Sequence, residues 1–450
     1  MRRAAVPLLA LTAALVLADS AIVTLALPEI LRRLNGTVAQ VAWVLIAFNL
    51  VLALGVVPAA MVLVRRDPAP LCAAGIAVFA AASATCALAG SMNVLIAARC
   101  VQAVGGAFAL VGCLELLVAA TDERRGVAAW IAAGVIGTAT GPVAGGLLTE
   151  AISWQAIFVV QVPIAVLAVP AALTIRGIPV HPPERHRPAV LPNVALVLLS
   201  AALTAALFLL VLLLVDGWRR SPAIAALTVT VVPVAAFVAR PFARLARAGP
   251  QSETAAGCLL IAGGLAALAL PPSAHLAWTI APQALVGLGL GLTVDSLTTD
   301  ALRDRFPRAL HGGWTISARH AGVVLGLAIL TPVFTADLHD AQEPAQEAIT
   351  ALVVDAPLRA QDKIALAQGL SDRLVAERGR VPDLHPAFAT LQLPPAERPA
   401  ADQLERDLNN QLERAATRAF RDSFLIGAGL ALLALAALVP LRRRVPRSAS

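Results

Sequence analysis

Two charged residues lie deep inside apolar segments, where each charge costs about 2.5 to 3.5 kcal/mol to insert into a membrane. Asp19 lies in the first apolar segment and Arg99 in the fourth. A rise of 1.5 Å per helical residue places both about 10 Å below the same membrane surface. We expect them to pair beside a central cavity, with Asp19 binding and releasing a proton. The alternative is a static ion pair that only fixes helix register.

A second set of charges lies toward the opposite membrane surface. Asp295 and Arg319 are expected at matching depth, with Glu115 at the same end of its own segment. Such residues suit either a salt bridge at a gate or a direct part in coupling. His320, beside Arg319, is expected to be a hydrogen-bonded packing residue.

One apolar segment carries three glycines at the spacing of a helix face. Gly137, Gly141 and Gly145 fall at i, i+4 and i+8, so a neighbouring helix can approach backbone to backbone. Pro142 removes one hydrogen-bond donor, and Gly146 extends the small surface. The pattern predicts a packing seam with a hinge.

The composition places the whole chain in a bilayer. Of 450 residues, 58% are hydrophobic and 14% charged, and the mean hydropathy is +0.78, which excludes an ordinary soluble domain. We expect twelve spans, and the arginine-rich loops predict that both termini are cytoplasmic. The spans begin near residues 6, 41, 70, 93, 126, 153, 190, 221, 254, 276, 313 and 422.

The order of the segments predicts two six-helix bundles and one insert. The insert is polar and acidic, and helical spacing of apolar residues in Ile349–Val354, Ile364–Val375 and Leu404–Leu412 favours helices there. A Pro-rich stretch, Val381–Pro399, would form turns. The expected parts are a bundle over 1–175, a cytoplasmic linker over 176–189, a bundle over 190–441 that contains an extracytoplasmic insert over 336–420, and a basic cytoplasmic tail over 442–450.

Other chemistries find no support in the sequence. The glycine-rich run Gly287–Gly291 lies inside an apolar segment, so it indicates close helix packing and not a phosphate-binding loop. The chain has no P-loop lysine pattern, His/Cys metal constellation or nucleophile elbow. We therefore expect no enzyme activity, metal, cofactor or nucleic acid. The expected partners are the lipid bilayer, protons, a small hydrophobic or cationic substrate and, at the insert, a possible extracytoplasmic protein.

Several segments resemble the major facilitator superfamily, and within it the drug:proton antiporter branch that usually has fourteen spans. The first segment, Leu17–Pro28, is similar to that branch's D-x-T-I-V-N-V-A-L-P signature. The fourth, Arg99–Ala107, is similar to R-x-x-Q-G-x-G-A and contains Gln102, Gly105 and Gly106. The seam at Gly137–Gly146 is similar to the antiporter motif of span five.

The resemblance implies an all-α integral membrane protein of a bacterial cell membrane that exports hydrophobic or cationic compounds in exchange for protons. The sequence departs from the family after the second segment, where Met61–Pro68 lacks the usual glycines and loop aspartate of a cytoplasmic latch. Two alternatives stay open. One is an exporter of a lipid, metabolite or amino acid, and the other is a non-transporting scaffold that binds a partner through its insert.

Overall fold

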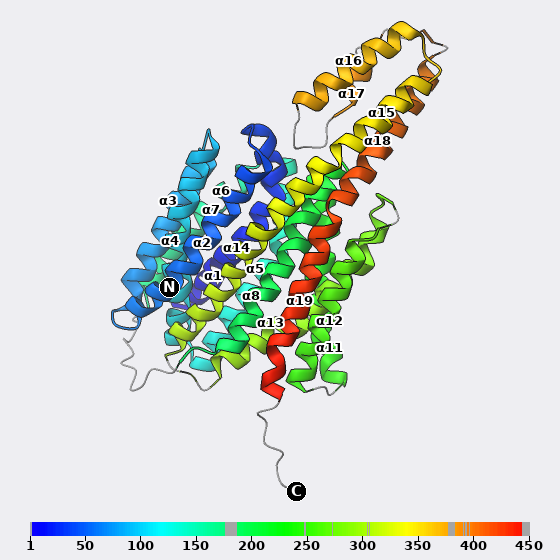
Figure 1. Ribbon diagram of the computed structural model, residues 1–450. Coiled ribbons are helices and arrows are strands. Elements are labelled where there is room, and N and C mark those ends of the chain that lie inside the picture. The colour runs from blue at the N-terminus through cyan, green and yellow to red at the C-terminus, as the bar shows by residue number, and fades with distance from the viewer. Residues whose placement is uncertain are drawn as a thin grey trace.

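The computed structural model is mostly helical, with turns and loops but no strands, in the residues it describes, which are 2–175, 187–246, 249–271, 273–303, 305, 307–376, 383–389, 391, 394–395 and 397–442. Eleven helical segments within these residues are long and apolar enough to cross a membrane. The expected linker lies mainly in 176–186 and the expected tail in 443–450, both outside the described residues. Figure 1 gives the course of the chain.

The first part of the chain, called here the N-terminal half, contains seven helices. Side-chain caps fix where several of them begin: Thr37 and Gln40 form a capping box, and Asp122 accepts a hydrogen bond of 2.9 Å from the backbone N–H of Arg125. The helices are α1 (Arg2–Arg33), α2 (Val38–Leu63), α3 (Pro68–Ala87), α4 (Met92–Ala120), α5 (Glu123–Ala151), α6 (Ala156–Val159) and α7 (Gln161–Leu173).

The remainder, called the C-terminal half, contains the other helices, including two short π-helical stretches and the insert. Its members in the bundle are α8 (Val190–Thr204), η1 (Ala205–Leu209), α9 (Leu210–Leu212), η2 (Leu213–Gly217), α10 (Pro222–Val229), α11 (Val231–Ala246), α12 (Pro250–Leu268), α13 (Ala277–Leu302), α14 (Arg308–Asp340) and α19 (Arg421–Arg442). Those of the insert are α15 (Gln342–Asp355), α16 (Ala360–Ala376), α17 (His385–Ala389) and α18 (Arg398–Ala419).

The predicted count of twelve spans differs by one from the eleven segments that meet the length and hydropathy criteria. The span expected near residue 254 corresponds to α12, whose first turn is polar because it contains Gln251, Ser252 and Glu253. That turn lowers the mean hydropathy of a helix of only 19 residues. Nevertheless, α12 packs along α13 and α19 as a full member of the bundle.

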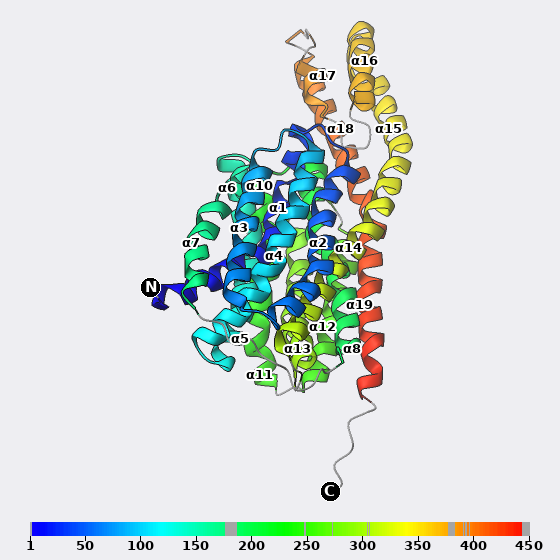
Figure 2. The ribbon, with the colours of Figure 1, turned by 90° about the vertical axis from the view of Figure 1, so that its left-hand side faces the viewer.

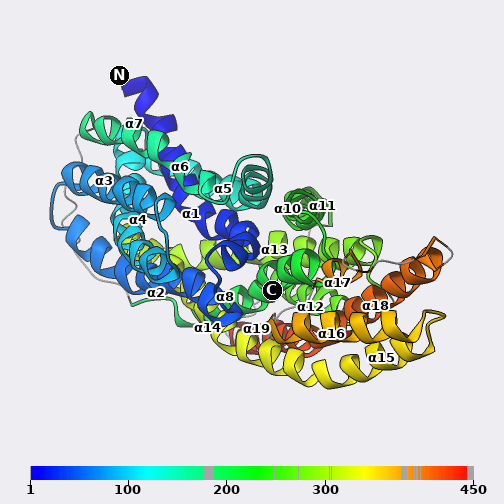
Figure 3. The ribbon, with the colours of Figure 1, turned by 90° about the horizontal axis from the view of Figure 1, so that it is seen from above.

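The two halves meet along two pairs of helices. Seen from above, α2 lies beside α14, and α5 lies beside α10 (Figure 3). Within the halves, α1 packs on α5, α4 and α7, whereas α8 packs on α14 and α19. Any signal that passes between the halves therefore has α2–α14 and α5–α10 as its main routes.

The insert extends from one end of the bundle, called here the insert end (Figures 1 and 2). Helices α15 and α18 continue the directions of α14 and α19, with single-residue breaks at Ala341 and Phe420. The insert has its own apolar core, built from Ile349, Leu366, Leu370, Phe388, Leu408 and neighbours. The three predicted helical stretches are confirmed, and the expected turn region contains the short helix α17.

Candidate functional site

Asp19 and Arg99 form an ion pair between α1 and α4. The pair joins Arg99 Nη1 to Asp19 Oδ2, and both side chains are 0% exposed. Asp19 lies midway along α1, and Arg99 lies two turns into α4, which begins behind the Ser91 cap. The predicted pairing is therefore present.

Two glutamines complete the surroundings of the carboxylate. Gln161, the first residue of α7, donates from Nε2 to Asp19 Oδ1 at 2.9 Å, and Gln102 Nε2 lies 3.4 Å from the same oxygen. Arg99 Nη1 donates to Gln102 Oε1 at 2.6 Å, while Gln102 Nε2 also lies 2.8 Å from Ser83 Oγ. All of these side chains are buried. We call Asp19, Arg99, Gln102, Gln161 and Ser83 the buried polar cluster.

The guanidinium of Arg99 is enclosed by aromatic rings and backbone. Its carbon lies 4.0 Å from the centre of the Phe48 ring and 5.8 Å from that of Phe158, distances at which a cation is attracted to the ring face. Arg99 Nε donates to the carbonyl of Val44 at 3.4 Å. Arg99 Nη2 is buried without a hydrogen-bond partner among the described residues. The N–H groups on this nitrogen are therefore the unsatisfied donors of Arg99 in this conformation.

The buried position of the pair corrects one expectation. The sequence placed Asp19 and Arg99 beside a central cavity, yet both side chains are fully enclosed within the N-terminal half. The residues that enclose them come from α2, α3, α4, α6 and α7. Proton exchange at Asp19 would therefore require helix movement, since no solvent reaches the carboxylate in this conformation.

The glycine seam packs against the helix that carries Asp19. A Cβ at Gly137 would overlap the carbonyl of Ala14, and one at Gly145 would overlap that of Ile22. At Gly141 a Cβ would lie 3.2 Å from the Ala18 carbonyl oxygen. The backbone-to-backbone approach predicted from the sequence is thus found, and its partner is α1.

Gly146 belongs to a different face of α5. A Cβ there would lie 2.8 Å from the carbonyl oxygen of Pro222, at the start of α10. Next to this contact, Glu150 accepts a hydrogen bond of 2.7 Å from the backbone N–H of Ala223. Helix α5 therefore holds α1 through one glycine face and α10, from the other half, through a second. Pro142 is buried within the helix between these contacts.

The remaining motif residues serve packing in this structure. A Cβ at Gly105 would lie 2.7 Å from the carbonyl oxygen of Gly75 in α3, whereas one at Gly106 would lie 3.0 Å from Val16 in α1. Pro28 is buried inside α1, close to its end. The run Gly287–Gly291 also packs closely, against α11 and α12, as its place in an apolar segment predicts.

The second set of charges does not join the buried polar cluster. Glu115, Asp295 and Arg319 lie on α4, α13 and α14, and each side chain is partly exposed. Asp295 does take part in a polar or electrostatic contact. The pairing of Asp295 with Arg319 stays a prediction.

His320 makes a contact that the sequence did not reveal. Its Nδ1 lies 2.6 Å from Oδ1 of Asn49, and so connects α14 to α2 across the two halves. Ser20, the neighbour of Asp19, donates to the same oxygen at 3.3 Å. The expectation that His320 is a hydrogen-bonded residue holds, but its partner belongs to the other half.

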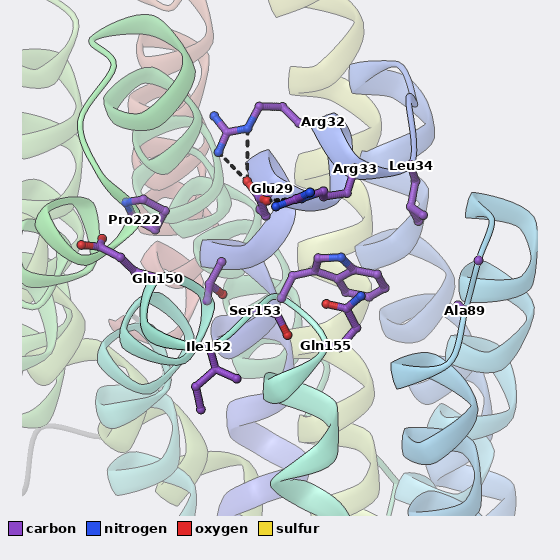
Figure 4. Close-up of a pocket in the computed structure, with 13 residues that line it drawn as sticks. Glu29, Arg32, Arg33, Leu34, Ala89, Glu150, Ile152, Ser153, Gln155 and Pro222 are labelled. Carbon is purple, nitrogen blue, oxygen red and sulfur yellow. Dashed lines mark hydrogen bonds and ion pairs between the residues drawn. The ribbon is translucent and has the colours of Figure 1, made fainter.

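A cavity of about 660 Å³ opens at the insert end, near α1, α5 and α10 (Figure 4). Glu29 lies in its wall and accepts hydrogen bonds of 2.8 Å from both Arg32 and Arg33. Glu150 and Pro222, from the contact of the two halves, also line it. This cavity is separate from the buried polar cluster, because Asp19 and Arg99 are not among its lining residues.

Sequence reasoning missed Gln161, Ser83 and Asn49. Each is an uncharged polar residue in a largely apolar helix, and each belongs to a segment without a charge that would draw attention to it. A buried amide needs partners for all its polar atoms. Searching for lone Gln and Asn residues in the spans would have found two of the three.

Comparison with known proteins places the chain in a family. Residues 9–330 match the family model described as Major Facilitator Superfamily. The fold is similar to the crystal structure of a bacterial homolog to the human lysosomal transporter Spinster, in an inward-facing and unoccupied conformation, with a TM-score of 0.63. The two chains are 13% identical, and the similarity covers 99% of each.

Curated relatives match parts of the sequence. An uncharacterized MFS-type transporter, Rv1250, from Mycobacterium tuberculosis is 36% identical over 172 residues, which are 37% of this chain and 30% of that protein. The tetracenomycin C resistance and export protein of Streptomyces glaucescens is 34% identical over 160 residues, 35% of this chain and 30% of the relative. The methylenomycin A resistance protein of Streptomyces coelicolor is 31% identical over 226 residues, 49% of this chain and 46% of the relative.

These matches span less than half the length of each of these relatives, whereas the family model covers most of this chain. The all-helical fold with many apolar spans agrees with that family. The chain is a multi-pass membrane protein and belongs to the Major Facilitator Superfamily.

Proposed function

We propose that this protein exports hydrophobic or cationic compounds in exchange for protons, with Asp19 as the proton-binding group. The observation that carries the proposal is the buried polar cluster. An acid with no solvent exposure, held by one arginine and two glutamines, lies within a membrane-spanning helix. Ionisable groups in such places mark ion or proton pathways more often than they contribute stability.

The cluster suits a carboxylate that changes charge during a cycle. With Asp19 ionised, Arg99 balances it, and the Gln161 amide donates to its second oxygen. With Asp19 neutral, the positive charge of Arg99 loses its partner but keeps Gln102 Oε1, the Val44 carbonyl and the Phe48 ring. Both charge states thus retain polar partners, which offset part of the cost of leaving the buried guanidinium without its counter-ion.

The driving force is sufficient for export without ATP. One proton that crosses about 100 mV releases about 2.3 kcal/mol, and one pH unit adds about 1.4 kcal/mol. The sum corresponds to roughly a 500-fold gradient of a neutral solute. In the cycle proposed here, protons from outside neutralise Asp19 and favour release of substrate. Loss of the proton on the inner side restores the binding state.

The names of the relatives and the composition of the chain support the proposed substrate class. Relatives that match parts of the chain are a tetracenomycin C resistance and export protein and a methylenomycin A resistance protein. The chain has no tyrosine and few charges, which favours apolar or lipophilic cationic compounds over sugars. We place the protein in a bacterial cell membrane with both termini cytoplasmic, because the arginine-rich loops lie on that side in the predicted topology.

Liposomes that contain the purified full-length protein test the proposal. An imposed pH gradient should drive movement of a lipophilic cation, tetraphenylphosphonium, with opposite movement of protons. The Asp19→Asn variant resembles the protonated state, so it should bind the cation more weakly and lose the coupled flux. Absence of coupled flux in the wild type with a panel of hydrophobic compounds would reject proton-coupled export of this class.

The rival interpretation, a non-transporting scaffold that binds a partner through the insert, predicts a different dependence on the insert. Because α15 to α18 have their own apolar core, residues 342–412 can be replaced by a short polar linker. An exporter should keep most of its flux after this deletion. If the wild type shows no flux and the deletion abolishes binding of a partner protein, the scaffold interpretation is favoured.

A further inference from the structure

The buried polar cluster makes its hydrogen bonds within the N-terminal half. Among the described residues, the hydrogen bonds and ion pair of Asp19 go to Arg99 and Gln102 in α4 and to Gln161 in α7. Transport by rocking bundles requires that the charge state of Asp19 changes how the two halves sit against each other. A link from the cluster to the C-terminal half is therefore needed.

Asn49 occupies the place where such a link can begin. Its neighbour in α2, Phe48, supplies the ring that lies 4.0 Å from the Arg99 guanidinium. Its hydrogen-bond donor in α1, Ser20, is the residue next to Asp19 and lies 3.3 Å away. Asp19 is thus connected to Asn49 through its neighbour Ser20, and Arg99 is connected to it through Phe48, the neighbour of Asn49.

The contact of Asn49 with the other half has a defined direction. Asn49 Nδ2 donates to the Leu45 carbonyl at 2.8 Å, which turns the amide oxygen toward His320. That oxygen can only accept, so the Nδ1 atom of His320, 2.6 Å away, must carry a proton. One oxygen therefore accepts from α1 and from α14, and Asn49 and His320 are 0% and 8% exposed.

We propose that Asn49 and His320 form the link that transmits the state of Asp19 and Arg99 to the C-terminal half. His320 acts as a positioning residue: it donates to Asn49 in the present arrangement of the halves and releases it when α1 and α2 move. Breaking the contact would leave the Asn49 oxygen with only the longer bond of 3.3 Å from Ser20 and would take the acceptor from a buried His320 N–H. Because a buried donor without its acceptor is costly, the contact favours one arrangement. The inference depends on the proposed function, since it assigns the step between proton binding and bundle movement.

The same helix pair offers a matched control. Ser317, three residues before His320 in α14, donates to the Ala53 carbonyl in α2 at 2.6 Å. This bond also joins the two halves and is of similar length. It ends on backbone of α2, one turn away from Asn49, and so lacks the connection to Ser20 and Phe48. Removing it tests what loss of any bond between α2 and α14 does.

The experiment measures tetraphenylphosphonium binding and pH-driven flux in liposomes for four forms of the full-length protein. His320→Leu should lose about tenfold in maximal flux while its Kd for the cation stays within about twofold. His320→Asn, whose amide nitrogen can stand where Nδ1 stands, should recover most of the flux. Ser317→Ala should stay within about twofold of the wild type. Equal flux in His320→Leu and Ser317→Ala would overturn the proposal.

A thermodynamic cycle keeps the inference separate from transport itself. Thermal unfolding in detergent is measured for Asp19→Asn, His320→Leu and the double variant. If the two sites are linked, the destabilisation of the double variant differs from the sum of the single effects. The same cycle with Ser317→Ala should be additive. Additivity in both cycles would overturn the link, whereas absence of flux with a non-additive first cycle would count against the proposed function alone.

Discussion

Gln161 of α7 donates a 2.9 Å hydrogen bond to the carboxylate of Asp19 in α1, although the two residues are 142 positions apart. The bond places the first residue of α7 directly at the acid that the motif in α1 supplies. Gln161 directly follows the single-residue break at Val160 between α6 and α7, and its side chain is fully buried. The acid therefore depends on a residue outside its own motif.

Replacing this glutamine tests that dependence. Gln161→Leu removes the donor to Asp19 Oδ1 and leaves buried polar atoms of Ser83 and Gln102 with fewer partners. We expect a loss of about 1 to 3 kcal/mol in the free energy of unfolding, together with a marked fall in coupled flux. Thermal unfolding in detergent and liposome flux measure the two effects. The control is Gln403→Leu, on the exposed face of α18, and equal behaviour of both variants would contradict the account.

The glycine seam makes a prediction about stability. Gly137→Ala places a Cβ on the carbonyl of Ala14, where backbone cannot yield without moving α1. We expect destabilisation of about 1 to 3 kcal/mol. Gly263→Ala, at a glycine with nothing within 4 Å of its Cβ position, should instead be neutral or stabilising by up to about 1 kcal/mol. Paired thermal unfolding curves check this, and similar midpoints for the two variants would count against a close α1–α5 contact.

The attachment of the insert should depend on pH. Partial burial alone would raise the pKa of Asp383, but the hydrogen bond and charge of Arg219, and the backbone N–H of His385, lower it below its ordinary value. A carboxyl with a lowered pKa in the folded state stabilises that state above its ordinary pKa of about 3.9, and the contribution disappears as pH falls through the lower folded value. Acid should therefore release the insert from Arg219, which bonds Asp383 at 2.7 Å.

Hydrogen exchange measures this release. Amides of α17 (His385–Ala389) and of η2 (Leu213–Gly217) should lose protection as the pH falls below about 4. Asp383→Asn should start with lower protection and show a weaker pH response. An unchanged pH response in this variant would show that Asp383 does not hold the insert. The hydrogen bond from Trp218 to Thr417, 2.9 Å long, contains no titratable group and provides the internal reference.

Much of the fold could be predicted because hydropathy and glycine spacing are local signals. The spans, the helices of the insert and the close packing at Gly137, Gly141 and Gly145 follow from patterns within single segments. Which helix packs against the glycines depends on the tertiary structure. The seam predicts a close neighbour, but only the folded chain identifies that neighbour as α1.

The candidate site was predictable only in part, for the same reason. Asp19 and Arg99 stand out because charges are rare in spans, and their ion pair is found. The partners Gln161, Asn49 and Ser83 are uncharged, so they stand out less in an apolar segment than a charge does, and no spacing pattern connects them. Enclosure of the pair also escaped prediction, because exposure depends on how α2, α3 and α7 close around it.

Proton release on substrate binding tests the central claim most directly. Tetraphenylphosphonium is added to the purified protein in weakly buffered detergent, and the pH change is recorded for the wild type, Asp19→Asn and a control, Asp340→Asn, whose side chain is exposed. If Asp19 is the proton-binding group, the wild type and Asp340→Asn release protons as the cation binds, whereas Asp19→Asn binds the cation more weakly and, even when saturated with it, releases no protons. Equal proton release by Asp19→Asn and the wild type would contradict the account.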